Sequence, residues 1–175
     1  MVAHGVPLGE EQGGAVAGGV DAFAGDLVVE TFDVRVVNTQ EDVRVRLVGK
    51  DARPDDASMK ALKHAFRAFP DDAEGPLDPA LVEVLHQIAK ATGARVDVVS
   101  AYRKPRHRWD KNYHVRGQAA DVRVPNVPTW KLVRLVKKLG VKGVGNYPTS
   151  AFVHVDTRDV PYTWTDWSGP SRPSK

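Results

Sequence analysis

The chain has 175 residues, of which 42% are hydrophobic and 27% are charged, with a net charge of +3 at pH 7. This composition is typical of one globular domain and argues against a largely disordered chain. No apolar stretch approaches the roughly 18 residues of a membrane-spanning helix, so none is expected, and the N-terminus lacks the pattern of a secretory signal. The chain contains no cysteine, which excludes disulfides and thiolate metal sites, so a metal would need His, Asp or Glu ligands.

The sequence divides into three predicted parts. Residues 1–25 are rich in Gly and Ala and show no sustained periodicity, which predicts a flexible leader. Residues 26–167 carry the hydrophobic patterns of strands and helices, and we expect them to form one folded domain. Residues 168–175 are polar and rich in proline, and we expect a C-terminal tail there.

The first part of the domain predicts strands followed by a helix. Residues 43–47 alternate apolar and arginine side chains, the period of two that is typical of a strand, and residues 38–41 would form the turn before it. Residues 55–69 then place apolar side chains at helical spacing. Asp56 or Ser58 can cap the start of this helix.

Two further helices are predicted downstream. The first has Asp78 as its N-cap, Pro79 at its first position and Gly93 just beyond its end. The second covers residues 129–140, and Thr129 can cap it.

Strand-like segments lie between and after these helices, at residues 95–102, 118–124 and 151–157. Three helices combined with strands predict an α+β fold. Its simplest form is a small antiparallel β-sheet with helices packed against it.

Candidate metal ligands gather on two of the predicted strands. The stretch YHVRGQAADVRV places His114 seven positions before Asp121, with a glycine that permits a sharp turn between them. His154 and Asp156 share one face of the strand FVHVD, because alternate side chains of a strand point the same way. Two imidazoles and one carboxylate can hold a catalytic zinc and leave a position open for water. Alternatively, the histidines are hydrogen-bonded core residues and Asp121 caps a turn, and spacing alone does not decide.

Three stretches resemble the M15 family of zinc peptidases that act on peptidoglycan. They are SAYR at residues 100–103, HVRGQAAD at 114–121 and GVGNYPTSAFVHVDT at 143–157. The chain is most similar to the branch known as DUF882, which includes bacterial murein endopeptidases that cleave peptide cross-links. The likeness covers about residues 26–167 and implies the zinc peptidase fold shared with hedgehog and D-Ala-D-Ala peptidases.

The resemblance implies roles for four side chains. His114, Asp121 and His154 would be the zinc ligands. Arg103 would face the substrate, where its permanently charged, planar guanidinium suits either the scissile carbonyl or a nearby carboxylate.

The sequence departs from the family pattern at two positions. Several relatives carry an acidic residue three positions before the last histidine ligand, where this chain has Ala151. Asp156 is therefore our candidate general base, although it could equally orient His154 by accepting its free N–H. Tyr113 stands where many relatives carry serine, which could reshape the pocket without removing a ligand.

By this resemblance we expect a zinc-dependent peptidoglycan peptidase, most simply an endopeptidase that hydrolyses peptide cross-links through a metal-activated water. One alternative is an inactive, zinc-containing module that binds peptidoglycan, and another is a D,D- or L,D-carboxypeptidase on stem peptides. A metal-dependent nuclease is suggested only by basic residues. We expect peptidoglycan stem peptides and no nucleic acid as partners, and export to the periplasm or cell envelope. The sequence predicts neither the substrate-binding residues nor the oligomeric state.

Other features allow two interpretations each. The basic segment RKPRHR at residues 103–108 could line a groove for anionic stem peptides, but a solvated loop is favoured for all of it except Arg103, its histidine included. Trp164 and Trp167 could form a wall for the substrate, but packing of the C-terminal segment over the sheet is favoured. Gly143 and Gly145 are expected to serve a turn.

Overall fold

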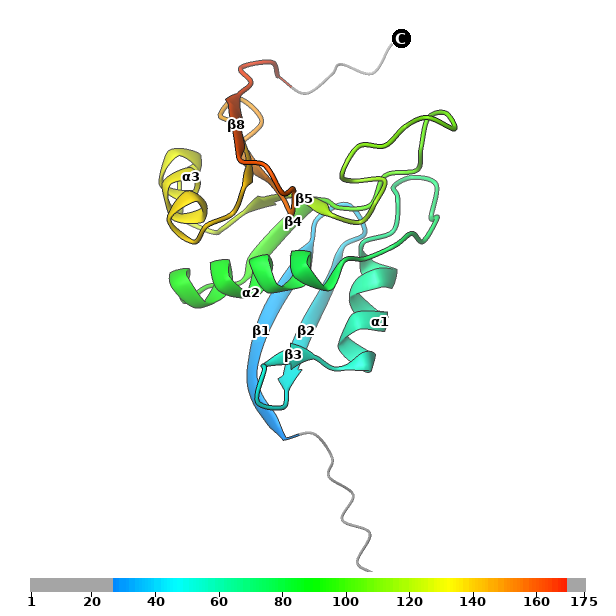
Figure 1. The fold of residues 1–175 in the computed structure, drawn as a ribbon, viewed down its shortest axis with the longest axis vertical. Helices are drawn as coiled ribbons and strands as arrows, with labels where there is room; N and C mark the ends of the chain where they lie inside the picture. Colours follow the sequence, from blue (N-terminus) through cyan, green and yellow to red (C-terminus); the bar gives the residue numbers. More distant parts are fainter. Residues whose placement is uncertain (1–26, 170–175) are drawn as a thin grey trace, which may run out of the picture.

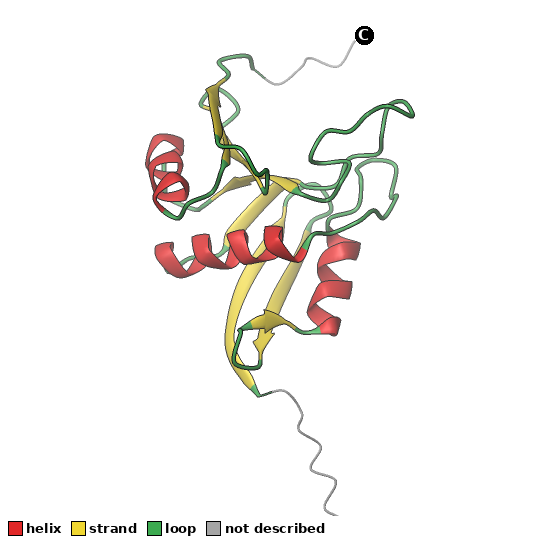
Figure 2. Ribbon diagram, in the orientation of Figure 1, coloured by secondary structure: helices red, strands yellow, loops and turns green. Residues whose placement is uncertain are grey.

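A mixed β-sheet with helices packed against it makes up the described part of the chain (Figures 1 and 2). The computed structural model describes residues 27–169. The leader predicted over residues 1–25 lies outside the described residues, as does most of the tail predicted over residues 168–175. The domain boundaries therefore stay a prediction.

Eight strands and three helices follow one another along residues 27–169. The strands are β1 (Val28–Val36), β2 (Glu41–Val48), β3 (Arg53–Pro54), β4 (Val96–Ser100), β5 (Ala119–Arg123), β6 (Gly143–Tyr147), β7 (Phe152–Asp156) and β8 (Tyr162–Thr165). The helices are α1 (Asp56–Ala65), α2 (Pro79–Thr92) and α3 (Thr129–Lys138). The three predicted helices are confirmed, although the first ends at Ala65 and does not reach residue 69.

The strands form one sheet in the order β3-β2-β1-β4-β5-β7-β6-β8. Neighbouring strands are antiparallel except for the β1–β4 and β6–β8 pairs, which are parallel. The predicted α+β class is confirmed, but the sheet is larger than expected and mixed rather than antiparallel. The cause is the connectivity: β2 returns along one edge of β1, so β4, which follows α1 and α2, joins the other edge. A crossover of that length allows β4 to run in the direction of β1.

The helices bury apolar faces against the sheet. Figure 1 shows α2 lying across the strands, with α1 beside β2, and α3 packs on β6 and β7. Leu81, Leu85 and Ile88 of α2 are fully buried in the core, and burial of each such side chain contributes about 1.5–3 kcal/mol. The alternation predicted for residues 43–47 is confirmed, since its three apolar side chains are buried and its two arginines are exposed. None of the described helices has the length and apolar character to cross a membrane.

The ends of α2 are as predicted. Asp78 accepts a hydrogen bond from the Ala80 N–H at 2.9 Å, Pro79 occupies the first position, and Gly93 ends the helix with φ +63°. A left-handed residue at this point favours glycine, which has no Cβ to clash.

The caps predicted for the other two helices are wrong. The N-cap of α1 is Asp55, whose carboxylate accepts from the Ser58 N–H at 2.7 Å. The Ser58 hydroxyl instead accepts from the Arg46 N–H at 2.9 Å and so ties α1 to β2. In α3, Pro128 precedes the first helical residue, Thr129, and no side chain caps that end. In both helices the extended residue that must precede the first turn lies earlier than predicted, one position before Asp56 in α1 and one position before Thr129 in α3.

Candidate metal centre

Two neighbouring strands and one loop bring the three predicted ligands together. Asp121 on β5 and His154 on β7 are register partners in the antiparallel pair. His114 lies in the loop before β5, where Gly117 adopts φ +69° and its N–H donates to the His114 carbonyl at 3.1 Å. A Cβ at Gly117 would lie 2.0 Å from the Pro76 carbonyl oxygen, so this close approach requires glycine. The predicted sharp turn is therefore confirmed.

The ligand atoms of these residues form a small triangle. His114 Nε2 lies 3.2 Å from His154 Nδ1, which lies 3.0 Å from Asp121 Oδ1, and the third side measures 3.4 Å. In a tetrahedral zinc site with bonds of about 2.0–2.1 Å, two ligand atoms are about 3.3 Å apart. All three residues are buried, with at most 8% of their surface exposed. Among residues 27–169, this is the group whose geometry could hold a metal ion.

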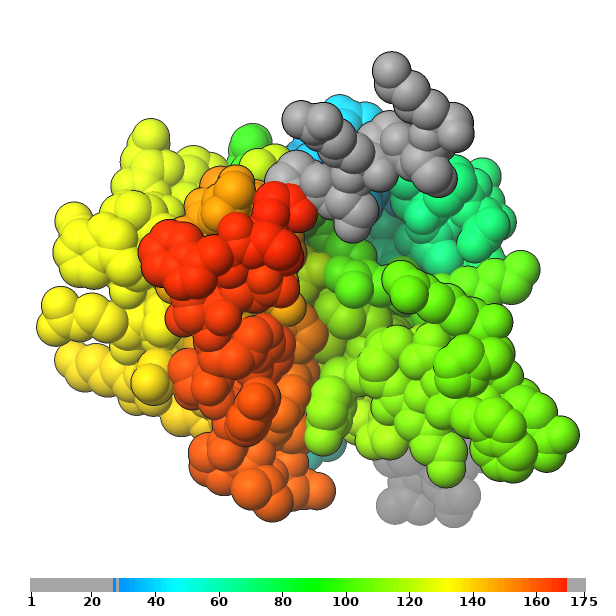
Figure 3. All heavy atoms as spheres, turned by 90° about the horizontal axis from the view of Figure 1, so that it is seen from above, coloured from blue at the N-terminus to red at the C-terminus, as the bar shows by residue number. Residues whose placement is uncertain are grey.

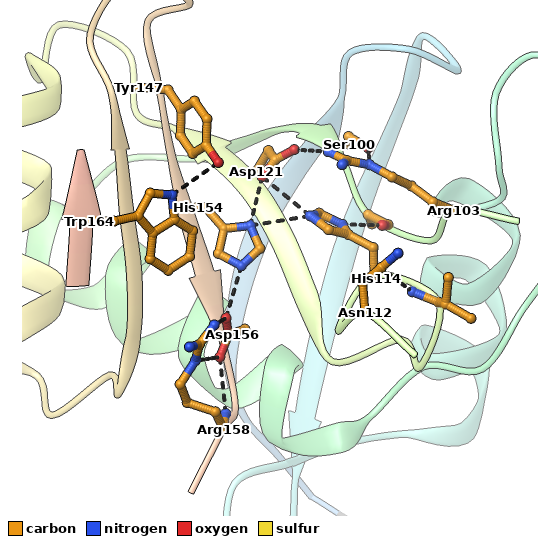
Figure 4. Close-up of polar contacts among 12 residues, drawn as sticks. Ser100, Arg103, Asn112, His114, Asp121, Tyr147, His154, Asp156, Arg158 and Trp164 are labelled. Carbon is orange, nitrogen blue, oxygen red and sulfur yellow. Dashed lines mark hydrogen bonds and ion pairs between the residues drawn. The ribbon is translucent and has the colours of Figure 1, made fainter. Parts of the chain in front are cut away.

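Each imidazole has a hydrogen-bond acceptor on the side that faces away from the other imidazole (Figure 4). His114 Nδ1 lies 2.6 Å from the Ala101 carbonyl oxygen, which can only accept, so this nitrogen carries the hydrogen. His154 Nε2 lies 2.9 Å from Asp156 Oδ2, to which it donates whenever Nδ1 carries no hydrogen. In that form the lone pairs of His114 Nε2 and His154 Nδ1 point toward each other and toward the Asp121 carboxylate. Three acceptors at such short distances repel one another unless a proton or a cation lies between them.

The electrostatic surroundings keep the carboxylate ionised. Burial alone would raise the pKa of Asp121, but the hydrogen bonds that the two histidines donate to it when they are protonated, together with the charge of Arg103, hold it well below its usual range. Burial lowers the pKa of His114, which favours its neutral, ligating form. Burial would also lower the pKa of His154, but its hydrogen bonds to Asp121 and Asp156 raise it.

Arg103 lies beside this group and faces the solvent. Its Nε donates to the Ser100 hydroxyl at 3.0 Å, and its terminal nitrogen donates to Asp121 Oδ2. Asp121 thus presents one oxygen to the histidines and the other to the guanidinium. About half of the Arg103 side chain is exposed, so it can also meet a bound molecule.

A cavity of about 530 Å³ opens over the three ligand candidates. One wall is basic and comes from the loop between β4 and β5, with Arg103, Lys104, Arg106 and His107. The opposite wall is aromatic and comes from β6, β7 and β8, with Tyr147, Phe152 and Trp164. Seen from above, the loop, in yellow-green, and the C-terminal segment, in orange and red, face each other across a furrow (Figure 3).

The sequence model of one peptidase family matches residues 28–164 and carries the description peptidoglycan L,D-endopeptidase MepK. This chain belongs to that family. The M15 membership predicted from the motifs is confirmed. The MepK family match covers the sheet from β1 to the first residues of β8, and with them the whole His-Asp-His group.

Two curated members of the MepK family illustrate the similarity. The probable peptidoglycan L,D-endopeptidase MepK of Haemophilus influenzae is 33% identical over 121 residues, which are 62% of this chain and 64% of the relative. The peptidoglycan L,D-endopeptidase MepK of Escherichia coli K12 is 31% identical over 111 residues, which are 57% of this chain and 61% of the relative. The chain thus spans about three fifths of the length of these relatives.

In this MepK-family chain, Asp156 does not line the cavity but is buried behind His154. It is 1% exposed, and Arg158 donates to both of its carboxylate oxygens, from Nε at 2.7 Å and from its terminal nitrogen at 2.5 Å. Burial would raise the pKa of Asp156, but the hydrogen bonds from Arg158 and His154 hold it well below its usual range. The carboxylate is therefore an ionised acceptor behind His154.

The turn predicted for Gly143 and Gly145 is wrong, because both residues lie within β6. Each makes room for a large neighbour. A Cβ at Gly143 would lie 1.9 Å from Asp156 Oδ1, and a Cβ at Gly145 would lie 2.5 Å from the Trp164 ring. Two glycines at alternate positions of a strand are thus a signal of space for side chains on one face.

Several residues outside the predicted site line the cavity or lie beside it. Lys104, Arg106 and His107, interpreted as a solvated loop, line its basic wall. Trp164, interpreted as packing, also lines the cavity, with its ring centroid 5.1 Å from that of His154. Arg158 carries no motif signal, because its contacts include side chains from distant parts of the sequence, such as Tyr113.

Proposed function

We propose that this chain is a zinc-dependent peptidoglycan endopeptidase that hydrolyses L,D-configured peptide cross-links. The observation that carries the proposal is the buried triangle of His114, Asp121 and His154 at the base of an open cavity. Membership of a family described as peptidoglycan L,D-endopeptidase supports the substrate and the type of bond.

The donor set suits zinc. His114 would bind through Nε2, His154 through Nδ1 and Asp121 through Oδ1, which together supply two nitrogens and one oxygen. Three protein ligands are the number found in catalytic zinc sites, where the fourth position belongs to water or substrate. Zinc bound in this way lowers the pKa of its water to about 7 and polarises a carbonyl.

The surrounding residues would bind and orient the substrate. Arg103 donates to Ser100 from Nε and to Asp121 from one terminal nitrogen, so its other terminal nitrogen would meet the scissile carbonyl or a stem-peptide carboxylate. The basic wall would attract the acidic groups of stem peptides, and the aromatic wall would pack against their aliphatic parts.

Of the two roles considered for Asp156, we propose the orienting one. Its oxygens are already engaged by His154 and Arg158, and its side chain does not line the cavity. A general base must reach the proton that it abstracts, either directly or through one water, and Asp156 lies on the far side of the His154 ring. The proposed role is to hold the His154 ring with Nδ1 toward the metal.

The inactive binding module is the alternative with a specific observation behind it. Ala151, at the position where several relatives carry an acid, is exposed and adopts φ +55° in the turn between β6 and β7. A chain without a proton acceptor there would bind peptidoglycan and leave it intact.

The proposed activity also implies where the protein acts and on what. Activity on peptidoglycan would place the protein in the cell envelope, with stem peptides as its partners and without nucleic acid.

Cleavage of defined muropeptides tests the proposal. The purified chain is incubated with dimers joined by an L,D bond and with dimers joined by a D,D bond, with and without a chelator. Chelator-sensitive cleavage of the L,D dimer alone is the expected result. Retention of both dimers uncleaved would support the binding module, and release of a terminal residue without dimer cleavage would support a carboxypeptidase.

A further inference from the structure

We propose that Arg158 is a positioning residue that acts through Asp156 on His154 and thereby sets the affinity of the site for its metal. This inference rests on the proposed metal site. It adds a residue outside the ligand set and outside the motifs of the family resemblance.

The first step is the pair of hydrogen bonds by which Arg158 holds the Asp156 carboxylate. The guanidinium donates to both carboxylate oxygens, and the Arg158 backbone N–H donates to Oδ1 at 3.1 Å. A planar fork that meets both oxygens fixes the plane of the carboxylate as well as its position. β7 ends at Asp156, and the Arg158 side chain, two residues later, lies on the same side of the chain and reaches Asp156.

The second step is the contact between Asp156 and His154. The oxygen that receives the terminal nitrogen of Arg158 is Oδ2, and Oδ2 also accepts the His154 Nε2–H at 2.9 Å. Rotation of the carboxylate would break this hydrogen bond and free the imidazole to turn. Because Gly143 faces Asp156 across the strand pair without a side chain, β6 offers no side chain at that position to hold the carboxylate.

The third step is what holds Arg158 itself. Its guanidinium carbon lies 4.8 Å from the ring centroid of Tyr113 and 5.4 Å from those of Tyr162 and Trp164. Tyr113 immediately precedes His114, and the Trp164 ring packs against His154. Three aromatic faces from two separate segments therefore confine the cation, as cation–π attraction favours.

Arg158 thus connects the loop that carries one histidine with the strand that carries the other. The side chain is 16% exposed. A purely structural role would make it important for folding alone. A positioning role adds an effect on metal affinity that persists in variants that fold normally.

Zinc affinity, measured by competition with a chromophoric chelator, tests the inference. The variants are Arg158→Gln, Arg158→Lys, Asp156→Asn and the double variant Asp156→Asn with Arg158→Gln. Arg44→Gln is the matched control, because the Arg44 guanidinium donates to both oxygens of Asp33 in the same way, at 2.8 and 3.1 Å, between exposed side chains of β1 and β2. The visible absorption of the cobalt-substituted protein provides a second readout that reports ligand geometry and not activity.

The expected result is a loss of zinc affinity of about 10-fold or more in Arg158→Gln, comparable to the loss in Asp156→Asn, because outer partners of metal ligands typically contribute 10–100-fold. Arg158→Lys should recover part of the loss, since an ammonium keeps the charge but lacks the fork. The double variant should bind about as well as Asp156→Asn, because Arg158 acts through that carboxylate. The control should bind like the unmodified chain.

Different outcomes overturn different claims. If the unmodified chain binds no zinc, the proposed metal site fails and the inference fails with it. If the chain binds zinc and Arg158→Gln retains its affinity and cobalt spectrum, only the inference fails. Fully additive losses in the double variant would also overturn it. Should Arg158→Gln not fold, Arg158→Lys decides: unchanged zinc affinity and an unchanged cobalt spectrum would reject the positioning role.

Discussion

Asp121 and His154 are register partners on adjacent antiparallel strands, and their ligand atoms, Oδ1 and Nδ1, are 3.0 Å apart. Residues that are 33 positions apart in the sequence are thus held by the backbone ladder itself. Side chains of directly opposed residues start from Cβ atoms about 4.5–5.5 Å apart, which leaves little freedom in their separation. The strand pairing therefore holds two of the three candidate ligands at a nearly fixed separation.

Replacement of a proposed ligand should strongly weaken metal binding without unfolding the protein. For His154→Ala we expect a loss of zinc affinity greater than about 100-fold, because even an outer partner contributes about 10–100-fold. Equilibrium dialysis against buffered zinc measures the effect. His64→Ala is the control, since His64 lies on the exposed face of α1 and pairs with Glu74 at 2.8 Å. Near-native zinc binding by His154→Ala would show that the ion lies elsewhere.

Replacement of Arg103 by lysine should separate catalysis from metal binding. The ammonium keeps a positive charge near Asp121, so the zinc content should remain near that of the unmodified chain. The planar fork toward the substrate is lost, and kcat/KM on the L,D dimer should fall by about 10-fold or more. Steady-state kinetics and metal content are measured on the same preparation. Unchanged kinetics would remove Arg103 from the proposed substrate contact.

A methyl group at Gly143 should disturb the site through Asp156, the residue that holds His154. In Gly143→Ala the new Cβ would meet Asp156 Oδ1 at 1.9 Å, so either the carboxylate or the strand must move. Overpacking of this kind typically costs about 1–3 kcal/mol of stability, and here it should also weaken zinc binding. Gly169→Ala is the control, because the nearest atom to its Cβ would be 3.6 Å away. Thermal unfolding and zinc titration of both variants would check this, and identical behaviour would refute it.

Zinc affinity should fall as the solution becomes acidic, because protons compete for the same imidazole lone pairs. Burial would lower the pKa of His154, but its hydrogen bonds to Asp121 and Asp156 raise it above the usual 6.5, so His154 takes up a proton first as pH falls. The sign follows directly: affinity is constant above this pKa and declines below it. Titrations between about pH 8 and about pH 5.5 measure the decline. Affinity that stays constant over this range would contradict imidazole ligation.

The cap of α1 gives a test of stability away from the site. Asp55→Ala should lower the free energy of unfolding by about 1 kcal/mol. Asp56→Ala, one residue later, should lower the free energy of unfolding by less. The hydrogen bonds from Ser58 lower the pKa of Asp55, so its contribution is present above its unfolded value and is lost as pH falls through the folded pKa. Urea unfolding at neutral and acidic pH measures both effects, and equal costs for the two variants at neutral pH would contradict this cap.

Local patterns were sufficient to predict much of the fold. The helix caps at Asp78 and Gly93 and the alternation of residues 43–47 act over a few residues, so the sequence displays them directly. The mixed sheet was missed, because parallel pairing depends on which edge of β1 remains free after β2 has paired. That choice is made between segments about 60 residues apart.

In the site, too, local motifs could be predicted and contacts between distant segments could not. The motifs contain His114, Asp121 and His154, and the fold brings them together as expected. No motif points to Arg158, because its partners come from three separate segments. The basic loop and Trp164 were assigned to solvent and packing because their distance from the histidines depends on tertiary structure alone.

Metal content is the measurement that tests the central claim most directly. The chain is purified without added metal, loaded with zinc, desalted and measured by mass spectrometry beside His114→Ala treated in the same way. We predict about one zinc per chain, absent from the variant. A folded chain that carries no zinc after loading, or a variant that carries as much as the unmodified chain, would contradict the account.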